Sequence, residues 1–106
     1  MLDDGGRRCS WADLDAWSGR LAGAWRDRVG AGERVAILVG NGLPHLLGEL
    51  AAWRLGAIAV PIFIGAGAAR LADLLAQVAP ALVVSDLPEP DAGCPTLTSA
   101  AVLATA

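Results

Sequence analysis

A continuous apolar run occupies Arg34–Val39, and glycines lie on both sides of it. Such a short, β-branched run is typical of a strand that is buried on both faces. Leucines and alanines then recur at helical spacing over residues 43–55, with Pro44 in the first turn and Gly56 after the last helical residue as a left-handed cap. A second apolar run follows at Ile58–Val60. The pattern therefore predicts a strand–helix–strand unit with parallel strands and a right-handed crossover.

Upstream of this unit, the pattern predicts a hairpin followed by a long helix. Within residues 1–9, the sequence Asp4-Gly5-Gly6 supplies turn chemistry between two short arms. Ser10 and Asp13 have the spacing of a capping box, in which the hydroxyl and the carboxylate cover free amides at a helix start. A helix is expected over residues 11–28 because one face of this segment is apolar. That face comprises Leu14, Trp17, Leu21, Trp25 and Val29.

Downstream, a third helix and a third strand are expected. The helix follows Gly67 and ends before Pro80, and its buried stripe comprises Leu71, Leu74, Leu75 and Val78. The apolar run Ala81–Val84 predicts the strand, and the weakly patterned Thr96–Ala106 is compatible with a further strand and a short helix. The predicted fold class is α/β, a parallel βαβαβ sheet flanked by helices. Residues 1–106 are long enough for one domain or for one piece of a larger one, and the prolines at the start of 87–106 predict that this stretch is a connecting segment.

Composition narrows the possible functions. Hydrophobic residues make up 55% of the chain, which indicates a packed core, and the net charge of −3 gives a nucleic-acid partner no electrostatic support. All eight basic residues are arginines, which excludes chemistry that needs a lysine of this chain. Cys9 and Cys94 form no metal-spaced pair, and we expect them to be reduced thiols. Without a leader or an apolar stretch long enough for a membrane span, the chain is expected to be cytoplasmic.

Two glycine-rich turns are candidate nucleotide sites. Gly65-Ala66-Gly67 follows a strand and opens a helix, and Asp86 ends the next strand about 20 residues later, as in a dinucleotide-binding fingerprint. The third glycine is missing, however, because Arg70 stands in its place, and Pro61 within the preceding strand is unusual for this motif. A plain strand-to-helix turn is therefore the favoured interpretation. Gly40-Asn41-Gly42, followed by His45, is the weaker candidate.

The remaining polar and aromatic residues do not make a persuasive catalytic group. His45 is the only histidine, and we expect a surface or capping residue with no acid near it in sequence. The serines lack a nucleophile-elbow setting, namely Ser10, Ser18, Ser85 and Ser99. The acids are expected on solvated helix faces, namely Asp13, Asp15, Glu49 and Asp73. The tryptophans are expected to pack in the core, with an exposed partner-binding patch as the alternative, namely Trp11, Trp17, Trp25 and Trp53.

Four segments stand in a distinctive order along the chain. They are Arg8-Cys9-Ser10-Trp11-Ala12-Asp13-Leu14, then Gly32-Glu33-Arg34-Val35-Ala36-Ile37-Leu38 with Asn41 and Pro44 shortly after, then Trp53-Arg54-Leu55-Gly56-Ala57-Ile58-Ala59-Val60-Pro61, and finally Ala81-Leu82-Val83-Val84-Ser85-Asp86. In this order and spacing they resemble the start of the AMP-forming acyl-CoA synthetase family, within the adenylate-forming superfamily. The likeness covers residues 3–86 and implies part of a larger adenylate-forming N-terminal domain.

The resemblance also implies a reaction and its cofactors. A carboxylic acid and ATP, accompanied by Mg2+, would give an acyl-adenylate, and a thiol, usually that of coenzyme A, would then displace AMP. The family's lysine-ended phosphate loop, its adenine and ribose motifs and its catalytic lysine are not among residues 1–106. No catalytic, cofactor-binding or metal-binding residue is therefore carried over, and no cofactor is expected on this fragment. The chain is expected to be an inactive structural part of an acyl-CoA synthetase of fatty acid metabolism.

Other functions stay open at this point. A peptide-synthetase adenylation domain or an aryl-CoA ligase would share the same segments. A stand-alone nucleotide-binding module would use the turn at Gly65, and a non-catalytic interaction module would use an exposed sheet edge. A three-stranded sheet with open edges predicts that the chain pairs with itself or with the remainder of a synthetase.

Overall fold

The hydrophobic runs form one parallel sheet in the computed structural model, which describes every residue except 1, 5–6, 41, 64, 66 and 88–93. The strands of this sheet stand in the order β4-β3-β5-β6. Their bounds are β3 Arg34–Leu38, β4 Ile58–Pro61, β5 Leu82–Ser85 and β6 Thr96–Leu97. The register sets Ala36 beside Val60 on one side and beside Val83 on the other. The prediction of a parallel α/β fold is confirmed.

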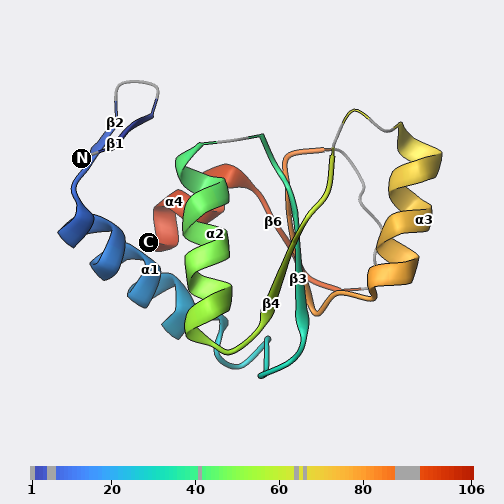
Figure 1. The fold of residues 1–106 in the computed structure, drawn as a ribbon, viewed down its shortest axis with the longest axis horizontal. Helices are drawn as coiled ribbons and strands as arrows, with labels where there is room; N and C mark the ends of the chain where they lie inside the picture. The colour runs from blue at the N-terminus through green and yellow to red at the C-terminus, as the bar shows by residue number, and fades with distance from the viewer. Residues whose placement is uncertain (1, 5–6, 41, 64, 66, 88–93) are drawn as a thin grey trace.

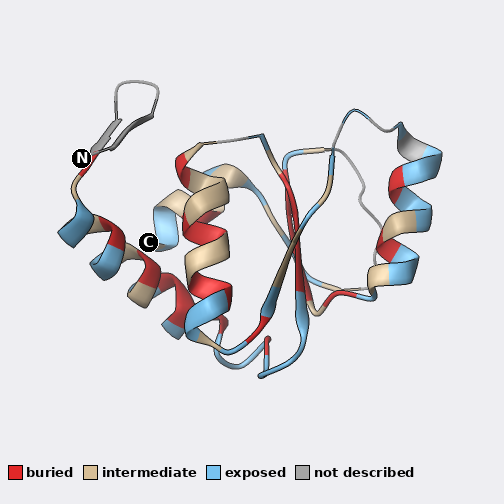
Figure 2. Cartoon of the chain, viewed as in Figure 1, coloured by how far each residue is buried: buried red, intermediate tan, exposed pale blue. Residues whose placement is uncertain are grey.

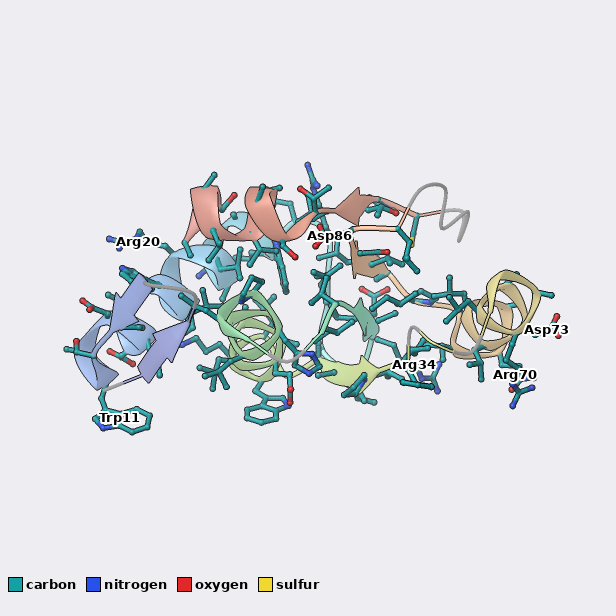
Figure 3. The ribbon with its side chains drawn as sticks, turned by 90° about the horizontal axis from the view of Figure 1, so that it is seen from above. Trp11, Arg20, Arg34, Arg70, Asp73 and Asp86 are labelled. Carbon is teal, nitrogen blue, oxygen red and sulfur yellow. The ribbon has the colours of Figure 1, made fainter. Side chains whose placement is uncertain are left out.

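Helices cover both faces of the sheet, as Figures 1 and 3 show. Their bounds are α1 Trp11–Trp25, α2 Leu43–Arg54, α3 Ala68–Val78 and α4 Ser99–Thr105. Helices α1, α2 and α4 lie on one face, and α3 stands alone on the other. A separate two-stranded hairpin, β1 Leu2–Asp4 with β2 Arg7–Cys9, precedes α1 as predicted. None of the helices in the described part of the chain is long and apolar enough to cross a membrane.

The order of the strands follows from the two crossovers. From β3 the chain passes through α2 to the neighbouring β4, and from β4 it returns through α3 to β5 on the far side of β3. Because the two crossovers run in opposite directions along the sheet, right-handed connections require α2 and α3 to lie on opposite faces, as they do. The carboxyl ends of β3 and β5 therefore form a topological switch point, where ligands bind in many open α/β sheets.

Side chains of β3 alternate between two hydrophobic cores. Val35 and Ile37 face α1, α2 and α4, whereas Ala36 and Leu38 face α3, and all four are buried (Figure 2). This alternation explains why the run Arg34–Val39 is apolar throughout rather than at every second position. The prediction of a strand buried on both faces is confirmed.

Helix ends agree with the local signals in the sequence, with one exception. Ser10 and Asp13 form the predicted capping box, in which the Asp13 amide donates to the Ser10 hydroxyl at 3.0 Å and the Ser10 amide donates to the Asp13 carboxylate at 3.0 Å. Gly56 has the left-handed φ of 71° expected of a helix-ending glycine. Helix α1, however, ends at Trp25 rather than Arg28, because the Arg28 amide donates to the Trp25 carbonyl at 2.8 Å in a tighter turn.

The segment after residue 95 contributes more to the fold than its weak pattern indicated. Thr96–Leu97 pairs with β5 and adds a fourth strand to the three that were predicted. In the helix that follows, the Val102 side chain is fully buried in the core shared with α1 and α2. A strand and a short helix were compatible with these residues, and both are present. Most of the preceding loop, residues 88–93, lies outside the described part of the chain.

Candidate functional site

His45 lies at the switch point, in the first turn of α2, and both of its ring nitrogens have partners. Nδ1 lies 3.1 Å from the carbonyl oxygen of Val39, at the end of β3, and Nε2 lies 2.7 Å from Oε1 of Glu49. The expectation that no acid lies near His45 was wrong, because Glu49 follows it by one helical turn and this spacing brings the two side chains together. His45 ties α2 to the end of β3, so neither nitrogen is free to act on a substrate in this arrangement.

Asp86 and Ser85, at the end of β5, are also engaged within the chain. One carboxylate oxygen of Asp86 accepts a hydrogen bond of 2.7 Å from the Ser99 amide, and the other accepts one from the Ser99 hydroxyl. The Ser85 hydroxyl accepts a hydrogen bond of 3.1 Å from the Leu87 amide. Asp86 therefore connects β5 to the start of α4. This is a different task from binding a ribose, which the dinucleotide fingerprint would assign to it.

The turn between β4 and α3 does not have the shape of a phosphate cradle. The ring of Phe63 lies over Gly65, so that a Cβ atom on that glycine would be 2.6 Å from the Phe63 Cζ atom. The strand before the turn, β4, is at the edge of the sheet rather than at its centre. Arg70 is exposed and points away from the sheet, as does Asp73 on the same helix (Figure 3). Ala66 of this candidate, and Asn41 of the weaker one, lie outside the described residues.

A groove of about 540 Å³ runs between α1 and α2. It is lined by Trp11, Leu14, Asp15, Ser18, Leu46, Leu50, Trp53 and Arg54. The volume is in the range of small-molecule sites, which is roughly 300–1,000 Å³. Trp11 is 67% exposed and Trp53 is 57% exposed, whereas Trp25 is buried and Trp17 partly buried. The expected core packing thus holds for Trp25 and Trp17, whereas Trp11 and Trp53 are exposed.

The polar end of this groove is organised by Arg54. Its Nε donates to the Ser18 hydroxyl at 3.0 Å, and its Nη2 donates to the Asp15 carbonyl at 3.1 Å and to the Asp15 carboxylate. These contacts join the end of α2 to the middle of α1. Sequence analysis did not identify this network, because Arg54 is at least 36 residues from each of its partners and no local spacing signals the contact. Asp15, which was expected on a solvated face, is indeed mostly exposed.

The two cysteines are separated by the sheet. The thiol of Cys9 is buried in the core next to α1, and Cys94 is half-buried beside the core under α3. Burial raises the pKa of both thiols, and the charge of Asp13 raises that of Cys9 further. Among the described residues, no group of three or more histidines, cysteines and acids is placed to hold a metal ion.

The family model described as "AMP-binding enzyme" matches residues 1–105. The chain belongs to this family. No curated protein matches the sequence.

Three solved structures have the same fold over 74–94% of the chain. Apo MatB from Rhodopseudomonas palustris is 24% identical with a TM-score of 0.81, over 94% of this chain and 23% of its own. A putative long-chain-fatty-acid CoA ligase from Rhodopseudomonas palustris CGA009 is 38% identical with a TM-score of 0.69, over 74% of this chain and 20% of its own. The NpsA N-terminal subdomain from Klebsiella oxytoca is 22% identical with a TM-score of 0.76, over 94% of this chain and 26% of its own. The chain thus spans about a quarter of the length of these three proteins.

Proposed function

We propose that the chain is a structural part of the large domain of an ATP-dependent acyl-CoA synthetase, which activates a carboxylic acid as an acyl-adenylate and transfers it to coenzyme A. The observation that carries this proposal is the family match over residues 1–105. The 38% identity to a protein described as a putative long-chain-fatty-acid CoA ligase favours a role in fatty acid metabolism. In this proposal residues 1–106 are one partial domain, in which residues 87–106 connect to the next part of the enzyme.

The chain by itself is proposed to be inactive. The family resemblance places a lysine-ended phosphate loop and a catalytic lysine in the parent enzyme, and this sequence has no lysine to supply either. The histidine and the acid at the switch point are both bound within the chain, and Phe63 covers Gly65. These contacts support the proposal that neither the switch point nor the turn after β4 holds ATP, Mg2+ or coenzyme A. We place these cofactors, and the carboxylic acid, on other parts of a cytoplasmic parent enzyme, and we assign no catalytic, cofactor-binding or metal-binding residue here.

A second candidate is the adenylation domain of a nonribosomal peptide synthetase or an aryl-CoA ligase. It is supported by the NpsA subdomain, solved with 3-hydroxybenzoyl-AMSN, and by the nonribosomal peptide synthetase FmoA3, whose structure superposes with a TM-score of 0.82 at 21% identity. Likeness at this level of identity supports the fold alone. A stand-alone nucleotide-binding module has less support. Such a module would use Gly65 and Asp86, but Phe63 lies against Gly65 and Ser99 is hydrogen-bonded to Asp86.

The proposal is tested by ATP–pyrophosphate exchange with a panel of fatty and aromatic acids. The chain alone is expected to give no exchange above a protein-free blank. A chimera that carries residues 1–106 in place of the matching segment of MatB is expected to fold and to retain exchange with the acid used by unsubstituted MatB. Exchange by the chain alone would contradict the structural role. A chimera with native-like circular dichroism but no exchange would show that this segment does not supply the scaffold.

A further inference from the structure

The ring of His45 has an oxygen acceptor at each of its two nitrogens. Nδ1 lies 3.1 Å from the Val39 carbonyl oxygen, and Nε2 lies 2.7 Å from Oε1 of Glu49. A neutral imidazole has one N–H group, so it can donate to only one of these oxygens, and its other nitrogen then faces an oxygen lone pair. The imidazolium has two N–H groups and can donate to both oxygens. The two contacts therefore match the protonated ring.

We propose that His45 is a protonation-dependent link between β3 and α2, complete in the imidazolium and broken at Val39 when the ring loses its proton. The contact with the Glu49 carboxylate is charge-assisted and the shorter of the two, so the neutral ring should keep its proton on Nε2. Nδ1 then presents a lone pair to the Val39 carbonyl oxygen, and this contact is lost. Deprotonation thereby releases the first turn of α2 from the carboxyl end of β3, at the switch point.

The surroundings of the ring support this role. The side chains of His45 and Glu49 are 15% and 23% exposed, so water competes only weakly for their hydrogen bonds. Helix α2 opposes the charge, because His45 lies in its first turn, where the peptide dipoles disfavour a cation. The Glu49 carboxylate offsets this effect, because it is in direct contact with the ring. The charged form of His45 thus depends on Glu49.

The charged groups on the strands around α2 are held elsewhere. Strand β4 and helix α4, which pack on α2, contain no ionisable residue. Arg34 is at the opposite end of β3 from Val39, and its guanidinium donates to the Val78 carbonyl. The Asp86 carboxylate, just after β5, is bound to the amide and the hydroxyl of Ser99.

The charged groups of α1 are also engaged away from the ring. Asp13 caps the start of its own helix, and Asp15 pairs with Arg54 at the far end of α2. Arg20 is exposed and lies on the side of α1 that is remote from α2 (Figure 3). Glu49 is therefore the ionisable group that the described structure brings to the histidine.

The stability of the chain between about pH 5.5 and pH 8.5 tests the proposal. His45 is the only histidine, and an ordinary histidine titrates at roughly pH 6.5, so in this range its proton is shared only with the N-terminal amine. The folded chain binds this proton through two contacts that the unfolded chain lacks, so their contribution is present at the lower pH and is lost as the pH rises. The unfolding equilibrium constant is expected to rise about 5-fold, the effect of losing one hydrogen bond of ordinary strength.

Glu49→Gln is the decisive variant. A side-chain amide can donate as well as accept, so the neutral ring can keep its N–H on Nδ1 for Val39 and accept at Nε2 from the amide. The variant is therefore expected to retain the link at both pH values and to lose the pH dependence. Asp73→Asn is the matched control, because Asp73 is an exposed acid on α3, across the sheet, and this variant should keep the 5-fold change. Urea denaturation gives the equilibrium constants, and circular dichroism verifies folding.

Nitrogen-15 spectra of the single histidine show the proton positions directly. Both nitrogens are expected to be protonated at the lower pH, and Nε2 alone at the higher pH, whereas in Glu49→Gln the remaining proton should move to Nδ1. A proton on Nδ1 of the unmodified chain at the higher pH would overturn the proposal. Equal pH dependence of stability in Glu49→Gln and the unmodified chain would also overturn it. None of these measurements involves adenylation, so they test the link separately from the proposed function.

Discussion

The two faces of the sheet differ in how many parts of the chain cover them. One face is covered by three helices, α1, α2 and α4, whose buried side chains form one large cluster with the strands (Figures 1 and 2). The other is covered by α3 alone, and Leu71 and Leu75 are the buried ones among the described side chains of this helix. The larger core joins segments from both ends of the chain, from Cys9 to Val102. It is therefore the part whose loss should unfold the whole molecule, whereas α3 can detach from a smaller contact.

Close approach of α2 to the sheet accounts for part of this difference. A Cβ atom at Gly48 would lie 3.4 Å from the Cδ1 atom of Ile37 and 3.9 Å from the Trp25 ring. The missing side chain at this position lets α2 lie near β3, with Leu47 fully buried beside it. The region around α3 is polar where it meets the sheet end, since Arg34 Nη1 donates to the Val78 carbonyl at 3.2 Å. The larger core is thus held together by close side-chain packing, whereas α3 is held in part by the hydrogen bond from Arg34 to its last residue, Val78.

The largest expected effect on the free energy of unfolding comes from truncating a buried leucine in the larger core. The same truncation in the smaller core gives the comparison. Leu47→Ala should lower the free energy of unfolding by about 4 kcal/mol, near the upper part of the range for buried leucines, because its surroundings are fixed by three helices and cannot collapse. Leu75→Ala, the matched change under α3, should lower it by about 2 kcal/mol, because a single helix can shift to fill the space.

Urea denaturation followed by tryptophan fluorescence measures both values, and amide hydrogen exchange locates the effect. Exchange in Leu47→Ala should accelerate throughout the sheet, whereas in Leu75→Ala it should accelerate mainly in α3. Equal losses with the same exchange pattern would show that the two faces unfold as one unit, and the distinction between them would be abandoned.

A smaller effect is expected at the start of α1, on the side with three helices. Ser10→Ala removes the hydroxyl that accepts from the Asp13 amide and should lower the free energy of unfolding by about 1 kcal/mol. Thr98→Ala, at the start of α4, is the matched control, because its hydroxyl accepts from the Ala101 amide at 3.1 Å. Thermal melts of both variants compare the two caps. No loss in Ser10→Ala would mean that the capping box does not contribute to this core.

The smallest expected effect is a pH dependence of the two thiols. Burial raises the pKa of both above the ordinary 9.0, so their contribution to stability is present below that pH and is lost as the pH rises through the folded-state values. The free energy of unfolding should therefore decline as the pH rises above 9.0, and it should decline less in Cys9→Ala, which a pH series of urea denaturation curves measures.

The two thiols should also differ in accessibility. Reaction with a disulfide reagent should label Cys94 before Cys9, because Cys94 is half-buried and Cys9 buried. Faster labelling of Cys9 would show that the core beside α1 opens more readily than the core under α3.

Most of the secondary structure could be predicted from local patterns. The capping box at Ser10, the proline in the first turn of α2 and the glycine after it depend on neighbouring residues, whose spacing is visible in the sequence. The parallel pairing of β3 and β4 followed from a crossover that contains a helix. The order of four segments also indicated the adenylate-forming family, which the match over residues 1–105 confirms. The family motifs lie along the chain, so they need no tertiary contact to be identified.

The candidate site was less predictable, because its contacts join distant residues. Glu49 could have been assigned to His45 from its spacing of four residues, but the link from His45 to the Val39 carbonyl needs the angle between β3 and α2. Asp86 reaches Ser99 only because β6 pairs with β5 and brings the start of α4 to the end of β5.

The sequence by itself determined most of the helices and strands, and the family, because periodicity, caps and motifs act over a few residues. Only the tertiary structure decided how those elements pair and pack, and which side chains are buried or exposed. It added β6 to the sheet, buried Val102, joined Arg54 to Asp15 and left Trp11 and Trp53 exposed on one groove. Each of these results depends on how helices pack across a sheet, and packing depends on shape and distance between residues far apart in the chain. Local sequence patterns do not indicate the shapes of distant segments or the distances between them.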